Sequence, residues 1–379
     1  MKIAILGGGI SGLSAAHFIL QKNPKAKITL FEKESELGGW MRKGPRTFQA
    51  GKCPHLLKLI HDMGLQDALV FSDPAAKNRF LWHRGKLRSP KSLIFPFIPL
   101  LLREPFISAS NEDESIHAFA SRRFSPQFAS LFFDPLTLGI YGGDSKKLSI
   151  RSCFPKLYEW EKKGSLLKGM LHAPKSKGGL FSLRSGMGTL VDALAKLPIE
   201  IKLNTRVETI PNFDRVYSAL PAFEIARLAH SSWEIPSISL HVVQLLYKKA
   251  NLPKKGFGYL IPSIEGQDLL GMIWNSSIFP DLYEKGSLSL TAMVRGDNPV
   301  QEALRASQDH LGLGPPDEIS SFYAENSIPQ FEVGYTRSLK LFEEEIQKKF
   351  INLRLLGNFL EGPSVESCIQ RSFKEISLN

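Results

Sequence analysis

Three glycines near the start of the chain have the spacing of a phosphate-binding loop. Gly7, Gly9 and Gly12 form the pattern G-x-G-x-x-G. In this pattern the first glycine permits a tight turn, the second lets the backbone approach a pyrophosphate, and the third lets a helix pack against a strand. The start of that helix offers free N–H groups and the positive end of its dipole to phosphate. The three glycines therefore predict a dinucleotide site.

A carboxylate stands where the ribose of such a dinucleotide would lie. Glu32 follows Gly12 by twenty residues, the separation at which an acid accepts hydrogen bonds from ribose hydroxyls. An acid also favours a free 2′-hydroxyl over a 2′-phosphate, which would require an arginine. FAD and NAD both satisfy these features.

The elements that must position these residues occur in the required order. Residues 2–6 form a short apolar run typical of a buried parallel strand, a helix is expected from Leu13 onward, and residues 28–31 form a second strand that ends at Glu32. Because strand, turn, helix, strand and acid are all in register, we disfavour a glycine-rich loop that binds nothing.

The segment Leu37-Gly38-Gly39 distinguishes between the two dinucleotides. It resembles the glycine pair by which amine-oxidase-like flavoproteins bring a second loop against the pyrophosphate of FAD. No second G-x-G-x-x-G follows in the chain for a nicotinamide nucleotide. We therefore predict that FAD is the cofactor and that no NADPH binds.

The composition describes a globular chain with excess positive charge. The 379 residues are 43% hydrophobic and carry a net charge of +11, which suggests an anionic partner. Because the basic residues are dispersed and no nucleic-acid module is visible, we expect an acidic membrane surface or a polycarboxylate substrate and no nucleic acid. The three cysteines lie far apart without histidines at ligand spacing, so we expect reduced, buried thiols and no metal. We also expect no signal peptide and no transmembrane helix.

One segment combines basic and apolar residues. A basic cluster at residues 83–91 precedes the apolar run of residues 93–102, which Pro96 and Pro99 interrupt. The two prolines exclude an ordinary helix. The run could be a core segment, but we favour a surface that dips into a bilayer with the basic side chains at the headgroups.

The remaining pattern predicts an α/β protein with two insertions. We expect a Rossmann-like FAD-binding domain built from residues 1–80, 179–225 and 331–379. Residues 81–178 would form a mainly helical, membrane-associating domain, and residues 226–330 an antiparallel-sheet substrate domain. Within these ranges we expect a strand turned back at Gly85, a helix over residues 154–170 and a hairpin-like loop over residues 178–188.

Motifs along the chain resemble one family, the protoporphyrinogen IX oxidases. Residues 6–13 and 37–40 are close to it, and Asn78-Arg-Phe-Leu81 resembles the segment that supplies a substrate-binding arginine. The most specific match is Gly-Ile-Tyr-Gly-Gly-Asp at residues 139–144, followed by residues 147–155, with residues 328–330 and 361–369 completing it. The resemblance covers nearly the whole chain, although the chain is some tens of residues shorter than most relatives.

The resemblance implies a haem-pathway reaction, the six-electron oxidation of protoporphyrinogen IX to protoporphyrin IX. Hydride would pass from a methine-bridge carbon to flavin N5, and molecular oxygen would reoxidise the flavin to give hydrogen peroxide. Because the flavin carries the chemistry, we expect no catalytic side chain and give none of the nine histidines that role. Arg79 would bind a propionate through a charge-assisted, bidentate contact, and Gly139 would lie against the macrocycle.

The resemblance also implies which residues bind FAD. They lie in the glycine loop, at the ribose, after the second glycine pair, near the isoalloxazine, at the adenine and at the flavin end of the last helix. In this order they are Gly7, Gly8, Gly9, Ile10, Ser11 and Gly12; Glu32 and Lys33; Gly38, Gly39 and Trp40; Thr47, Phe48, Gln49 and Ala50; Val207; and Pro363, Ser364 and Val365.

Three other functions stay open from the sequence. A related enzyme would oxidise coproporphyrinogen III, whose four propionates suit a basic chain. An amine or phytoene-type oxidoreductase would leave the specific motifs unexplained. A non-catalytic FAD-binding protein of the haem pathway would bind flavin without turnover. We expect a cytoplasmic protein, peripheral on the inner face of a bacterial cell membrane (an organellar inner membrane in a eukaryote), and a possible homodimer.

Overall fold

The strand, turn and helix predicted at the amino end are present in a computed structural model of the chain. Strand β1 (Lys2–Leu6) leads into helix α1 (Ile10–Lys22), and β2 (Lys27–Phe31) returns parallel to β1. The structure describes residues 1–44, 46–173 and 178–378. The chain folds into two units, Met1–Phe71 with Ser176–Ile235 and Thr336–Asn379 (unit 1), and Ser72–Lys175 with Pro236–Tyr335 (unit 2).

Unit 1 is built around a five-stranded parallel sheet in the order β15-β9-β1-β2-β8. A second, three-stranded antiparallel sheet has the order β3-β7-β4. The remaining elements of unit 1 are β3 (Phe48–Gln49), α2 (Pro54–Asp62), β4 (Leu69–Phe71), β7 (Leu180–Leu183), α11 (Gly188–Leu194), β8 (Glu200–Lys202), β9 (Arg215–Ser218), α12 (Ala222–Leu228), β15 (Leu353–Leu355) and α16 (Val365–Leu378), with α15 (Tyr335–Lys349) beginning at the junction of the units.

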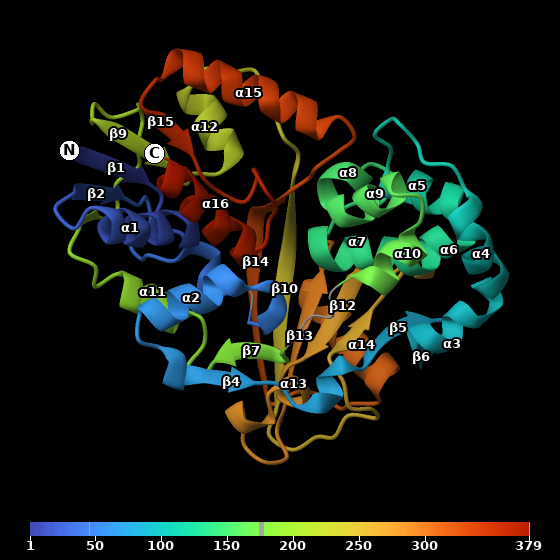
Figure 1. Ribbon diagram of the computed structural model, residues 1–379. Helices are drawn as coiled ribbons and strands as arrows, with labels where there is room; N and C mark the ends of the chain where they lie inside the picture. Colours follow the sequence, from blue (N-terminus) through green and yellow to red (C-terminus); the bar gives the residue numbers. More distant parts are fainter. Residues whose placement is uncertain (45, 174–177, 379) are drawn as a thin grey trace. The chain divides into compact units, whose positions relative to one another are not determined.

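One apolar core joins these elements. Side chains of β1, β2, α1, α2, β7, α11 and α16 form a single buried cluster that includes Leu13, Leu56, Phe181 and Ile369. Figure 1 shows α1, α2 and α16 side by side, and their contacts agree. Three stretches of the chain that are far apart in sequence therefore share one core.

Unit 2 contains a seven-stranded sheet in the order β14-β10-β13-β12-β11-β5-β6. Its pairings are antiparallel except for β5 with β11. The strands are β5 (Arg79–His83), β6 (Lys86–Arg88), β10 (Ser237–Tyr247), β11 (Gly258–Leu260), β12 (Leu269–Trp274), β13 (Leu288–Val294) and β14 (Glu318–Pro329). Helix α14 (Pro299–Leu311) contributes to the core on one face of this sheet. As predicted, β5 turns back at Gly85 into β6.

The helical part of unit 2 consists of short helices. They are α3 (Pro90–Ile94), α4 (Ile98–Arg103), α5 (Ile116–Arg123), α6 (Pro126–Phe128), α7 (Asp134–Tyr141), α8 (Ile150–Cys153), α9 (Pro155–Lys162) and α10 (Leu166–His172), with α13 (Asn275–Ile278) near the sheet. The proline-containing run is broken into α3, a 3-10 turn (Phe95–Phe97) and α4. Within the described residues, no helix has both the length and the apolarity needed to cross a bilayer.

Two local predictions are wrong. The expected hairpin-like loop over residues 178–188 contains one strand, β7, which pairs with β3 and β4 and not with a neighbour in the loop. The expected helix over residues 154–170 is two helices, because Gly164 adopts φ +103° between α9 and α10. The predicted boundary near residue 178 follows residues 174–177, which lie outside the described residues.

Candidate functional site

The glycine loop exposes bare backbone at the start of α1. An added Cβ at Gly12 would lie 2.0 Å from the carbonyl oxygen of Gly7, so only glycine fits there. A Cβ at Gly9, in contrast, would meet no atom within 4 Å. The first helical hydrogen bond runs from Leu13 N to Gly9 O, so the N–H groups of residues 10–12 are not used within the helix. Gly9 therefore borders free space, next to N–H groups that can bind phosphate.

The second glycine pair lies directly against this loop. The N–H of Gly38 donates to the carbonyl oxygen of Gly8 at 2.8 Å, and Gly9 and Gly38 form an isolated parallel bridge. A Cβ on Gly39 would meet only Gly9 Cα, at 3.9 Å. Two glycine segments from different parts of the sequence thus line one uncovered space. This arrangement fits a dinucleotide pyrophosphate, which needs close approach of the backbone.

Glu32 is fixed in place at the end of β2. Its Oε2 accepts a hydrogen bond from Gly8 N at 2.7 Å, and its Oε1 accepts one from Glu34 N at 3.0 Å. Each carboxylate oxygen keeps a further lone pair that can accept a ribose hydroxyl. The neighbouring Lys33 is exposed and pairs with Glu34 at 3.3 Å. Glu32 therefore has the geometry of a ribose acceptor.

The segment that ends at Val207 is anchored beside Glu32. The N–H of Thr205 donates to Glu32 O at 2.8 Å, and the N–H of Asn204 donates to Glu34 O at 3.0 Å. The carbonyl oxygen of Val207 accepts from Arg227 Nη2 at 3.3 Å. The half-buried Val207 side chain is therefore near the ribose end of the predicted site.

Two predicted segments follow the second glycine pair. Trp40 is 42% exposed. Two residues later, Arg42 donates to Leu37 O at 2.7 Å and pairs with Asp192 at 2.7 Å. Phe48 is buried in β3 opposite Phe181. Within the predicted segment Thr47–Ala50, Phe48 and Gln49 thus form β3 of the small sheet, and Ala50 directly follows it.

The start of α16 is also placed in unit 1. The Ser364 hydroxyl accepts a hydrogen bond from Ser367 N at 3.0 Å and so caps the helix. Farther along the helix, the buried Ser372 hydroxyl donates to Ser11 O at 2.9 Å. This bond ties α16 to the first turn of α1, the helix that follows the glycine loop. All the predicted FAD residues thus lie in unit 1.

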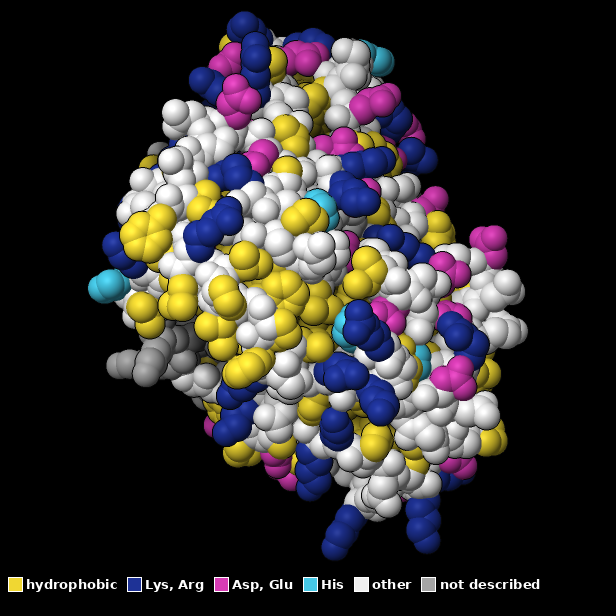
Figure 2. Space-filling model, turned by 90° about the vertical axis from the view of Figure 1, so that its right-hand side faces the viewer, with side chains coloured by type: hydrophobic (Ala, Val, Ile, Leu, Met, Phe, Trp, Pro, Cys, Tyr) yellow, Lys and Arg dark blue, Asp and Glu magenta, His cyan; other side chains and the backbone are white. Residues whose placement is uncertain are grey.

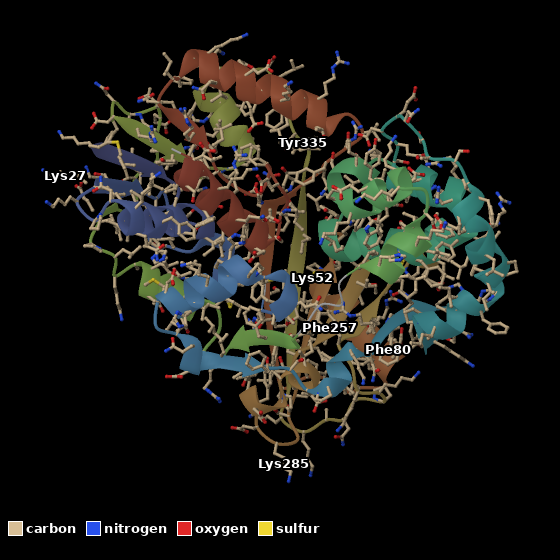
Figure 3. All side chains as sticks on the ribbon, viewed as in Figure 1. Lys27, Lys52, Phe80, Phe257, Lys285 and Tyr335 are labelled. Atoms are coloured by element: carbon tan, nitrogen blue, oxygen red, sulfur yellow. The ribbon has the colours of Figure 1, made fainter. Side chains whose placement is uncertain are left out.

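The predicted substrate residue Arg79 lies in unit 2, at the start of β5. Its guanidinium carbon is 4.5 Å from the ring centroid of Phe257, a residue labelled in Figure 3. The residue is exposed overall, yet the protein around the guanidinium removes enough solvent to lower the pKa of Arg79. Among residues 1–44, 46–173 and 178–378, no carboxylate forms an ion pair with it. Arg79 is thus a partly desolvated cation with an aromatic neighbour.

Arg79 begins a row of residues that crosses the sheet. The strand registers place Gly258, Ile273, Thr291, Gln244 and Ser320 in this row. The neighbouring row on the same face contains Leu81, Leu260, Gly271, Met293, Val242 and Phe322. This is the sheet face opposite the α14 core. Sequence reasoning missed these residues because period-2 alternation gives two faces but does not align one strand with the next.

Gly139 has a packing role that the sequence did not reveal. It lies within α7, where an added Cβ would be 2.7 Å from Leu260 Cδ2. The glycine therefore lets α7 approach β11. In the same motif, a Cβ at Gly143 would be 1.9 Å from Gln330 Oε1, and Gln330 donates to Tyr141 O at 2.9 Å. Two motifs noted in the sequence thus contact each other.

The next candidates for chemistry are the histidines and cysteines in the part of the chain that is described. No group of three or more potential metal ligands occurs among those residues. His310 is buried, stacks on Trp82 with 3.7 Å between ring centroids and bonds Tyr259 Oη at 2.9 Å. Burial lowers the pKa of His310 to about 4 and raises the pKa of the Cys53 thiol to about 11. Both groups are therefore neutral at physiological pH.

A parallel sheet with a bare glycine loop and a fixed ribose acceptor defines a dinucleotide-binding class of protein. Comparison with known proteins agrees with this class. The family model described as flavin containing amine oxidoreductase matches residues 10–219. A Bos taurus protein named protoporphyrinogen oxidase is 31% identical over 97% of this chain and 96% of its own length. A Staphylococcus aureus coproporphyrinogen III oxidase is 24% identical, with 97% of this chain and 96% of its own length covered.

A solved structure from Exiguobacterium sp. 255-15 has the same fold. Its TM-score is 0.86 at 21% identity, and the superposition covers 100% of this chain and 98% of the other. The chain therefore belongs to the flavin-containing amine oxidoreductase family and, within it, to the protoporphyrinogen oxidases. It is an FAD-dependent oxidoreductase. The alignment with the bovine protein runs over 461 positions, more than the 379 residues of this chain, so the bovine protein carries insertions.

Proposed function

We propose that the enzyme oxidises protoporphyrinogen IX to protoporphyrin IX, with molecular oxygen as the final electron acceptor. When bound, FAD supplies the two-electron oxidations. The pyrophosphate of FAD would lie at Gly9 and Gly39 and its ribose at Glu32, and no side chain is required as a base. The 31% identity to the bovine enzyme over nearly the full length of both chains supports this assignment.

The observation that carries the substrate class is the state of Arg79. Among the described residues, Arg79 has no carboxylate partner, and a substrate carboxylate would provide one. The planar guanidinium can form two parallel hydrogen bonds to a propionate. The apolar residues of the two sheet rows, among them Ile273 and Met293, would contact the macrocycle of the same substrate. Gly139, if it also contacts substrate, would do so from α7.

The charge of these rows favours a dicarboxylate. Among the twelve residues of the two rows, all within the described ranges, Arg79 is the only charged one. The four propionates of coproporphyrinogen III would need more cations than the two of protoporphyrinogen IX. Coproporphyrinogen III is nevertheless the second candidate, because the Staphylococcus aureus relative is named for it.

Turnover of the two substrates side by side tests this proposal. Purified protein with FAD is mixed in air with either porphyrinogen, and porphyrin fluorescence is followed above the spontaneous rate. We expect faster oxidation of protoporphyrinogen IX. Faster oxidation of coproporphyrinogen III would make that compound the assigned substrate. No turnover of either compound would refute the proposed reaction.

We also propose that part of unit 2 forms a peripheral membrane contact. Phe95, Leu102 and Phe106 are 74%, 70% and 86% exposed. Figure 2 shows one face on which hydrophobic side chains gather, with Lys and Arg along one side of them. Lys86, Arg88 and Lys91 immediately precede these apolar residues in sequence. Such a pairing of apolar and basic side chains fits an anionic bilayer surface.

This contact would place the enzyme on the cytoplasmic face of a bacterial membrane or on an organellar inner membrane. The proposed three-domain division is compatible with it. Residues 81–178 would be the membrane-associating part, residues 226–330 the substrate part, and the three remaining segments the FAD-binding part. Binding to anionic vesicles tests the contact, since protein that stays in the supernatant would refute it.

A further inference from the structure

One carboxylate joins the first turns of two helices in unit 1. Glu366 is the second residue of α16. Its Oε1 accepts hydrogen bonds from His55 N at 3.1 Å and His55 Nδ1 at 2.7 Å, and its Oε2 accepts one from Leu56 N at 2.9 Å. These donors lie at the start of α2, more than 300 residues away in sequence. Three hydrogen bonds thus connect the start of α16 to the start of α2.

Helix α2 depends on this carboxylate at its amino end. The helix begins at Pro54, and the preceding Cys53 forms no capping hydrogen bond with its side chain. The N–H groups of the first helical turn have no partner within the helix, and Glu366 binds two of them. A negative charge at this end also interacts favourably with the helix dipole. With its side chain only 12% exposed, Glu366 acts as a cap provided by another helix.

The two joined turns adjoin the segments proposed to face the flavin ring. The segment Thr47–Ala50 continues through a 3-10 turn (Ala50–Lys52), which ends at the Lys52 labelled in Figure 3, into Pro54 of α2. The segment Pro363–Val365 leads directly into Glu366. Figure 1 shows α2 and α16 next to each other in unit 1. The Glu366 bonds therefore connect these two segments where α2 packs against α16.

We propose that Glu366 is a positioning residue for the flavin ring. It holds the two segments at a fixed spacing, so that the ring binds in one orientation. Glu366 itself need not touch FAD. This inference rests on the proposed placement of Thr47–Ala50 and Pro363–Val365 at the isoalloxazine. It gives a role to Glu366, which lies in the family-like segment of residues 361–369 but to which the resemblance assigned none.

The test compares three substitutions with a control on the same helix. Glu366→Ala removes all three bonds. Glu366→Gln keeps one acceptor oxygen but places an NH₂ group against the other donors. His55→Ala removes only the Nδ1 bond. The matched control is Glu375→Gln, because Glu375 is another ion-paired carboxylate of α16 and contacts Arg354 and Arg371 instead.

Three readouts separate positioning from stability alone: the dissociation constant of FAD, the visible spectrum of the bound flavin and its reduction potential. For Glu366→Ala we expect FAD affinity to fall about tenfold, as when a group that orients cofactor ligands is lost, with a changed spectrum and potential. Glu366→Gln should lie between Glu366→Ala and the parent, and His55→Ala should change least. Glu375→Gln should keep the parent spectrum and potential.

A parent-like spectrum, potential and FAD affinity in Glu366→Gln and Glu366→Ala would overturn the proposal, even if both proteins melted at lower temperature. If Glu366→Ala does not fold, Glu366→Gln alone decides by the same readouts. Pro363→Gly tests the placement of the two segments separately from the role of Glu366. If that loop substitution also left the flavin spectrum unchanged, the placement of the segments would be wrong, and not only the role of Glu366.

Discussion

The N–H of Gly38 donates to the carbonyl oxygen of Gly8 at 2.8 Å, which brings the second glycine pair of the chain onto the first. The result is a strip of backbone without side chains, bordered by Gly9 and Gly39. The first glycine pattern predicts a dinucleotide and the second favours FAD, and the hydrogen bond between them brings both to one site. One pattern starts the phosphate-binding helix, and the other borders the same open space.

Gly9→Val tests this space. Because a Cβ at Gly9 meets no protein atom within 4 Å and the residue has an ordinary φ of −74°, the variant should fold with the stability of the parent apoprotein. Its side chain would occupy the path of the pyrophosphate, so the protein should be purified without FAD. Absorbance of bound flavin and thermal unfolding check the two expectations.

Gly314→Val is the matched control, because Gly314 also has open space around its Cβ position but lies in unit 2, after α14. It should retain full FAD. A yellow, fully loaded Gly9→Val protein would contradict the assignment of the pyrophosphate site.

Arg79→Ala should weaken substrate binding without loss of FAD. A charge-assisted contact contributes about 1.5–3 kcal/mol, so KM should rise roughly tenfold to a hundredfold. Arg79→Lys should recover part of this loss, since lysine keeps the charge but not the planar pair of donors.

Lys254→Ala provides the comparison, because Lys254 is also a cation over an aromatic ring, at 5.3 Å from Phe80, but belongs to neither sheet row. Its kinetics should match the parent. Unchanged kinetics in Arg79→Ala would remove Arg79 from the substrate site.

The membrane contact should depend on a few exposed side chains. Burial of a large apolar side chain contributes about 1.5–3 kcal/mol, so replacing both Leu102 and Phe106 by serine should lower partitioning into anionic vesicles at least about a hundredfold. FAD content should not change. Sedimentation with vesicles measures the effect.

Leu341→Ser with Ile351→Ser is the control pair, because these residues of unit 1 are similarly exposed, at 59% and 79%. Equal loss of vesicle binding in both pairs would indicate a nonspecific apolar effect and contradict the proposed surface.

His310 should make the stability of unit 2 depend on pH. Burial lowers its pKa from 6.5 to about 4, so the unfolded chain binds the proton more readily than the folded protein between these values. The stabilisation is complete above pH 6.5 and is lost as pH falls towards 4, by roughly 3 kcal/mol at most. In His310→Gln, which keeps an acceptor for Tyr259, this dependence should disappear. Thermal unfolding of both proteins from pH 7 to pH 4 measures it, and parallel curves would contradict the prediction.

Within unit 1, the sequence predicts the β1–α1–β2 elements better than the small three-stranded sheet, for a physical reason. Local patterns determine the β1–α1–β2 elements and place Glu32 at a strand end, because each feature depends on neighbours within about thirty residues. The wrong hairpin at residues 178–188 arose because β7 pairs with β3 and β4, distant strands that no local pattern indicates.

The same limit applies to individual residues of the site. Arg79 could be chosen from its sequence context, but its row with Ile273, Thr291 and Gln244 depends on the register of distant strands. Glu366 lies within the motif of residues 361–369, but nothing in that motif singles it out. Its importance follows only from the tertiary contact with the start of α2.

The most direct test of the central claim is rapid anaerobic mixing of the FAD-loaded enzyme with protoporphyrinogen IX. The account predicts that the visible absorbance of oxidised flavin falls after mixing while porphyrin forms, and that no porphyrin forms without the enzyme. The flavin absorbance should recover when oxygen is admitted. Flavin that stays oxidised in the presence of excess substrate would contradict the assignment of this chain as an FAD-dependent porphyrinogen oxidase.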